Sequence, residues 1–123
     1  MSLLYEDLTH KILGAAMEVH NTLGSGFLEA VYQEAMELEL NRQNVPFLAQ
    51  QELNITYKQQ ALKHKYKADL MVDRKVIVEI KALDRITGTE EAQAINYLKA
   101  TGCKVALLIN FGAKSLEWER LVL

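Results

Sequence analysis

The chain reads ADLMVDRKVIVEIK over residues 68–81, and this short segment is the most informative part of the sequence. Apolar residues alternate over 62–72 and form a β-branched run over 76–83, on either side of the polar triplet 73–75. Two such runs joined by a short polar connection are typical of a β-hairpin. We therefore expect an antiparallel pair of strands centred on Arg74.

Three charged residues interrupt this hairpin: Asp69, Glu79 and Lys81. Asp69 and Glu79 are equidistant from Arg74, so they face each other if the connection holds an odd number of residues. Glu79 and Lys81 are two residues apart and share a face. Opposed carboxylates repel, and a divalent cation between them removes the repulsion. Their hard oxygens suit Mg²⁺ or Mn²⁺. The alternative is an edge strand carrying a surface ion pair.

Elements on both sides of the hairpin extend it to a mixed α/β (α+β) fold. Apolar spacings of three and four indicate helices, and Thr87 with Glu90 matches a capping box. Alternation indicates strands, in the last of which we expect Trp118 to be buried. The expected order is ααβββαββ in one domain over 1–123, with a mixed sheet flanked by helices. The expected helices span about 4–21, 27–43 and 87–100, and the strands 53–57, 62–72, 76–83, 105–110 and 116–121.

Length and composition fit a small globular protein of 123 residues, 50% of them hydrophobic. Cys103 is the single cysteine, which excludes an internal disulfide. We find no signal-peptide pattern and no apolar run long enough to span a membrane, so we expect a cytoplasmic protein. Residues 1–57 hold two basic and eight acidic residues, and residues 58–123 hold twelve and eight. A basic face on the second part is compatible with a phosphate-bearing partner.

Two motifs resemble known families. Asp69 followed by Glu79-Ile80-Lys81 resembles the D…(D/E)-x-K signature of the PD-(D/E)XK nuclease superfamily, with Ala68 in place of the usual proline. Residues 26–32, GFLEAVY, match the G-x-x-E-x-x-Y motif of the GxxExxY protein family. This resemblance covers nearly the whole chain and implies a restriction-endonuclease-like fold with a Mg²⁺ site.

The resemblance also implies roles for individual residues. Asp69 and Glu79 correspond to the metal ligands, with the backbone carbonyl of Ile80 as a further ligand. Lys81 corresponds to the residue that positions the attacking water or stabilises charge on the phosphate. Glu29 corresponds to an acidic residue on the helix before the sheet, a metal ligand directly or through water. From its spacing alone, Glu29 is better explained as a solvated helix residue, and the family motif is what favours a role at the site.

Four further residues are predicted to surround this site. Tyr32, one helical turn after Glu29, holds that residue or packs beneath it. Gln93 and Tyr97 share a helix face and resemble the Gln-x-x-x-Tyr motif of the RecB-like branch. His20 is either near the site or a packing residue at a helix end.

Alternating lysines precede Asp69 on the same strand. Lys63, Lys65 and Lys67 share a face, and we expect them to steer nucleic-acid phosphates toward the metal. The alternative is a solvated strand face.

The function that we expect from these residues is Mg²⁺-dependent hydrolysis of phosphodiester bonds in nucleic acid, most simply DNA. The alternative is a non-catalytic module for nucleic-acid binding or protein interaction that retains the nuclease fold. A third interpretation treats the three charged residues as an ion-pair network. The chain is small, so a homodimer or a partner protein would enlarge its binding surface.

Overall fold

The computed structural model describes residues 3–123 and contains three helices and five strands in the described part of the chain. Their order is ααβββαββ, as predicted. The elements are α1 (Glu6–Leu23), α2 (Glu29–Arg42), β1 (Phe47–Tyr57), β2 (Gln60–Val72), β3 (Val76–Lys81), α3 (Gly88–Thr101), β4 (Val105–Asn110) and β5 (Glu117–Val122).

The five strands form one mixed sheet in the order β1-β2-β3-β4-β5. Strands β1, β2 and β3 are antiparallel neighbours, α3 connects β3 to the parallel strand β4, and β5 pairs antiparallel with β4. Such a parallel pair requires a crossover, which α3 supplies. The expectation of a mixed sheet flanked by helices is confirmed.

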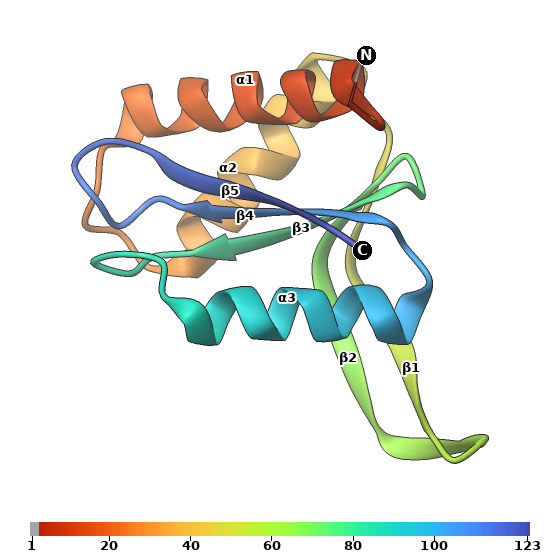
Figure 1. Ribbon diagram of the computed structural model, residues 1–123. Coiled ribbons are helices and arrows are strands. Elements are labelled where there is room, and N and C mark those ends of the chain that lie inside the picture. The colour runs from red at the N-terminus through yellow and green to blue at the C-terminus, as the bar shows by residue number, and fades with distance from the viewer. Residues whose placement is uncertain (1–2) are drawn as a thin grey trace.

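Helices cover both faces of the sheet (Figure 1). On one face, α1 and α2 pack over the even-numbered residues of β3, including Val78 and Ile80. On the other face, α3 packs over Ile77 through Ala94 and Leu98. Every residue of β4 is buried, which explains why it is apolar from Val105 to Ile109. Glu79 and Lys81 therefore belong to the sheet face that carries α3.

In the two-stranded ribbon of β1 and β2, the side chains of β2 switch sheet faces at Asp69. Ala68 packs in the cluster under α3, whereas Leu70 packs in the cluster under α1 and α2. Gln50, opposite this point, has a left-handed φ of 51°. Simple alternation would have kept both even-numbered residues on one face. The regular alternation expected over residues 62–72 is therefore interrupted at Asp69.

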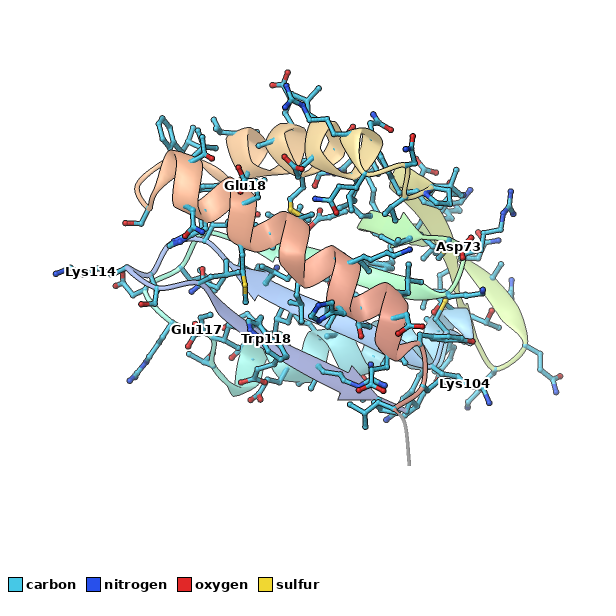
Figure 2. All side chains as sticks on the ribbon, turned by 90° about the horizontal axis from the view of Figure 1, so that it is seen from above. Glu18, Asp73, Lys104, Lys114, Glu117 and Trp118 are labelled. Carbon is cyan, nitrogen blue, oxygen red and sulfur yellow. The ribbon has the colours of Figure 1, made fainter. Side chains whose placement is uncertain are left out.

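Several local predictions can be compared with the structure. Thr87 caps α3 with a complete capping box to Glu90, as expected. Strand β1 begins at Phe47, six residues before the predicted strand. Trp118 is 42% exposed and is not a core residue, because it lies on the edge strand β5 beside α1, as the view in Figure 2 shows. None of the helices in residues 3–123 is long and apolar enough to cross a membrane.

Candidate active site

The hairpin of β2 and β3 brings Asp69 and Glu79 together. Strand pairing runs from Val72 opposite Val76 to Leu70 opposite Val78, with three residues in the turn. The register is the one expected for a hairpin centred on Arg74. Beyond Leu70, side chains replace the backbone ladder between the two strands.

Two hydrogen bonds hold the carboxylates at this point. The Ile80 N–H donates to Asp69 Oδ2 at 2.8 Å, and the Asp69 N–H donates to Glu79 Oε2 at 3.3 Å. The Asp69 carboxylate thus accepts a hydrogen bond that a β2 backbone carbonyl would accept in a continuous ladder, at the residue where β2 separates from β3. The two carboxylates are fixed by backbone groups and not only by their own side-chain torsions.

Burial and charge strongly perturb Glu79. The side chain is only 5% exposed, and burial together with the nearby Asp69 charge raises its pKa to about 7. The Asp69 N–H, the Tyr66 hydroxyl and Lys81 oppose this rise in pKa. Burial and the Asp69 charge therefore favour the protonated form of Glu79 when no cation is bound. A cation at the site would favour its charged form.

Tyr66 is the site residue that the sequence analysis missed. Its side chain is 6% exposed, and its buried hydroxyl lies beside Glu79 without a hydrogen-bond partner of good geometry in the described residues. Burial and the charge of Glu79 raise its pKa. Its ring stacks on Tyr97 of α3, with centroids 3.5 Å apart. Tyr66 looks like an ordinary apolar position of an alternating strand, so no sequence signal marks it.

A cavity of about 410 Å³ surrounds the two carboxylates. Lys81 is half-buried and lines it from β3, and Tyr97 lines it from α3. Glu29, although exposed, reaches the same cavity from the first turn of α2. The full lining is Glu29, Ile55, Lys65, Tyr66, Lys67, Asp69, Glu79, Lys81 and Tyr97.

A second cavity of about 500 Å³ lies on the α2 side of Asp69. Glu29 lines both cavities, and Glu34 and Glu37 line the second one. Gln33 connects α2 to the site, because its Nε2 donates to the Asp69 carbonyl at 2.9 Å and to Glu37 at 3.0 Å. The site therefore has an acidic wall on α2 and a basic wall of Lys65 and Lys67 on β2.

Tyr32 supports the loop before α2 and does not hold Glu29. Its hydroxyl donates to the Gly24 carbonyl at 2.6 Å and accepts from the Phe27 N–H at 3.2 Å. Its ring stacks on Phe111 at 4.7 Å. Tyr32 thereby fixes the turn from which α2, with Glu29 in its first turn, begins.

Three other predicted residues lie outside both cavities. His20 is buried at the end of α1, where its Nε2 is 3.0 Å from the Ala113 carbonyl. Gln93 is exposed on α3, although Tyr97 one turn later lines the first cavity. Lys63 is exposed on β2 beyond Lys65. The structure therefore does not bring these three residues to the carboxylate pair.

The oxygen atoms of the site fit a hard cation that keeps several of its water ligands. Within residues 3–123, no three His, Cys, Asp or Glu side chains lie close enough together to hold a metal ion by themselves. Mg²⁺ usually keeps several waters and binds one or two carboxylates together with substrate phosphate oxygens. Asp69 and Glu79 match that donor set, with the Ile80 carbonyl as a predicted third ligand.

Comparison with solved structures supports the fold. The crystal structure of SSO0001 superposes with a TM-score of 0.61 at 16% identity, covering 96% of this chain and 60% of that chain. This likeness concerns the fold alone, and this chain spans less than two thirds of SSO0001. No curated protein matches the sequence significantly.

The family comparison covers almost the entire chain. The model that describes the PD-(D/E)XK nuclease superfamily matches residues 6–121. That span includes the carboxylate pair, the lysine two residues after Glu79, and every helix and strand but the last residue of β5. The chain therefore belongs to the PD-(D/E)XK nuclease superfamily.

Proposed function

We propose that the protein is a Mg²⁺-dependent nuclease that hydrolyses phosphodiester bonds of DNA. The observation that carries this proposal is the meeting of Asp69, Glu79 and Lys81 in one cavity at the point where β2 leaves β3. Membership of a nuclease superfamily supports a nucleic-acid substrate. Nucleases of this superfamily generally use divalent metal ions.

In this proposal the site residues divide the chemistry between them. Asp69 and Glu79 hold the cation, with the Ile80 carbonyl. When bound, the cation lowers the pKa of a water molecule and neutralises charge on the phosphate. Lys81 orients the attacking water and stabilises the negative charge that develops on the phosphate. The half-buried position of Lys81 strengthens that interaction, because fewer water molecules screen it.

Glu29 and the GxxExxY motif complete the proposed site. The Tyr32 hydroxyl ties the Gly24 carbonyl and the Phe27 N–H to α2, so the motif determines where that helix begins. Glu29 then stands in the first turn, between the two cavities. We assign Glu29 to the metal through a bridging water, because no third carboxylate in the described chain is close enough for a shared direct site.

Metal titration with matched variants tests this function. We would titrate Mg²⁺ and Mn²⁺ by calorimetry and assay cleavage of supercoiled, linear and single-stranded DNA and of RNA. Asp69→Asn should lose metal binding and cleavage while keeping an acceptor for the Ile80 N–H. Lys81→Ala should keep metal binding and lose cleavage by about 100-fold or more.

The control is Asp73→Asn, which changes an exposed aspartate in the turn of the same hairpin. It should bind metal and cleave DNA as the wild type does. If no substrate is cleaved with either metal and Asp69→Asn behaves as the wild type, the nuclease proposal is wrong. The non-catalytic binding module would then be the better interpretation.

We also expect a second copy of the chain or a partner protein to extend the DNA-binding surface, because one chain of 123 residues offers a small one. Sedimentation of the protein with and without a DNA duplex measures this association.

A further inference from the structure

The outer part of the β1–β2 ribbon, residues 53–67, forms an arm that leaves the body of the molecule. Strands β1 and β2 stay paired out to Tyr57 opposite Gln60, beyond the point where β2 leaves β3 (Figure 1). The arm projects beyond α3 in Figure 1, and its β1 side, from Leu53 to Tyr57, spans roughly 17 Å at about 3.3 Å per residue. Leu53, Ile55 and Tyr66 pack its root against the cluster under α3, so the arm has an anchored base and a free tip.

The arm is strongly basic although the chain as a whole carries a net charge of −2. It contains four lysines and no aspartate or glutamate: Lys58, Lys63, Lys65 and Lys67. Of these four lysines, only Lys65 forms an ion pair within the described chain, with its Nζ 3.9 Å from Glu52 Oε2. Both side chains of that pair are about half exposed. Exposed pairs of this kind bind weakly, so the lysines are available to phosphates.

The lysine row leads directly into the proposed active site. Lys65 and Lys67 line the cavity that holds Asp69 and Glu79. Glu34 and Glu37 on α2 line the second cavity, on the other side of Asp69, and repel phosphates. A polyanion is therefore attracted along the arm and excluded from α2. This asymmetry gives the substrate one approach to the carboxylate pair.

The tip has the dimensions and chemistry of a groove-binding ribbon. Two strands joined by the tight Lys58–Gln59 turn, with both φ angles positive, leave Tyr57 61% and Leu62 41% exposed. The B-form major groove, about 12 Å wide, admits a two-stranded ribbon, whereas the A-form major groove is too narrow. The ring of Tyr66 is stacked on Tyr97, so the arm offers single-stranded bases no row of aromatic rings.

We propose that this arm grips duplex DNA, with its tip in the major groove and its lysine row along the phosphates that lead to the scissile position. The inference deepens the proposed nuclease function by naming a double-stranded substrate and the surface that holds it. Its test uses binding alone, so it does not depend on the protein cleaving anything.

The experiment compares two double variants in the Asp69→Asn background without added metal. Lys58→Ala/Lys63→Ala removes two arm lysines outside both cavities, and Lys11→Ala/Lys104→Ala removes two exposed lysines elsewhere. Fluorescence anisotropy measures binding of a labelled 20-base-pair DNA duplex at several KCl concentrations. The arm variant should bind about tenfold more weakly near 0.1 M salt and lower the log–log salt slope by about 2. The control variant should change neither quantity.

The same titrations with duplex RNA and single-stranded DNA of the same sequence complete the test. Both should bind more weakly than duplex DNA and respond less to the arm variant. Equal losses in both variants, or equal binding of duplex RNA or single strands, would overturn the proposal. Arm-dependent binding without any cleavage by the wild type would refute the nuclease and keep the arm. Cleavage that does not depend on the arm lysines would keep the nuclease proposal and refute the role of the arm.

Discussion

At the scale of single residues, Glu79 connects stability to pH. Its pKa is about 7 in the folded protein and near 4.5 in an unfolded chain, so the folded state binds more protons between these values. The contribution of protonated Glu79 to the free energy of unfolding is complete below about pH 4.5 and is lost as the pH rises through 7. Metal-free protein should therefore become less stable across this window.

We predict that Glu79→Gln removes most of this dependence and raises the metal-free unfolding free energy at pH 8 by on the order of 2 kcal/mol. Urea unfolding at pH 5, 6.5 and 8 measures it. Glu119 has a pKa raised in the same direction, chiefly by its hydrogen bond to Glu91, so the comparison must be between variant and wild type. Parallel pH curves for the two proteins would contradict the prediction.

Tyr66 gives a second prediction at this scale. Its hydroxyl lowers the pKa of Glu79, so Tyr66→Phe should raise that pKa further. If Glu79 binds the metal, the pH at which Mn²⁺ affinity is half-maximal should then move upward. Mn²⁺ titrations from pH 6.5 to 8.5 measure the shift. Tyr97→Phe keeps the same stacked pair and should leave the midpoint unchanged; equal shifts in both variants would assign the effect to packing.

At the scale of elements, two glycines give opposite predictions. Gly14 lies on the exposed side of α1 with nothing near an added Cβ, so Gly14→Ala should stabilise the protein by about 0.5–1 kcal/mol. At Gly112, after β4, an added Cβ would overlap the backbone of Ala82 and Leu83 where the chain leaves β3. Gly112→Ala should destabilise it by about 2 kcal/mol or more. Urea unfolding of both variants measures these changes. Equal stability of Gly112→Ala and the wild type would contradict the close contact between Gly112 and the backbone of Ala82 and Leu83.

Much of the fold was predictable from local patterns, and the failures have physical causes. The β2–β3 hairpin was predictable because its three-residue turn and apolar runs leave one register that buries both strands. The start of β1 was not, because residues 47–52 do not alternate and the ribbon turns over at Gln50. The Lys58–Gln59 turn lacks the Asn or Gly that usually marks such a hairpin.

The residues of the site likewise divide into those that local patterns predict and those that they do not. The relation of Asp69, Glu79 and Lys81 follows from strand geometry within fourteen residues of sequence. The place of Tyr66 depends on α3, whose Tyr97 is distant in sequence, and so no local pattern predicts it. Glu29 was predictable only through the family motif. The sequence alone does not show which side of α2 faces the sheet.

At the scale of the whole molecule, metal binding should appear as thermal stability. A ligand that binds only the folded state at ten times its Kd adds about 1.4 kcal/mol, or roughly 5 °C for a domain of this size. We predict such a rise in Tm on adding Mn²⁺ at pH 7.5. Asp69→Asn should show no rise and Asp73→Asn the full rise, in differential scanning fluorimetry. Equal shifts in all three proteins would indicate non-specific binding.

The hydrogen bond from the Ile80 N–H to Asp69 has a consequence for evolutionary drift. A lineage that no longer needs catalysis still needs an acceptor at this position, because an unpaired buried amide costs about 1–3 kcal/mol. Asparagine would meet that need and alanine would not. Glu79 is under the opposite pressure, since its buried charge destabilises the fold once no cation is bound. Inactive descendants of such a chain should therefore lose the glutamate first and retain a short polar residue at position 69.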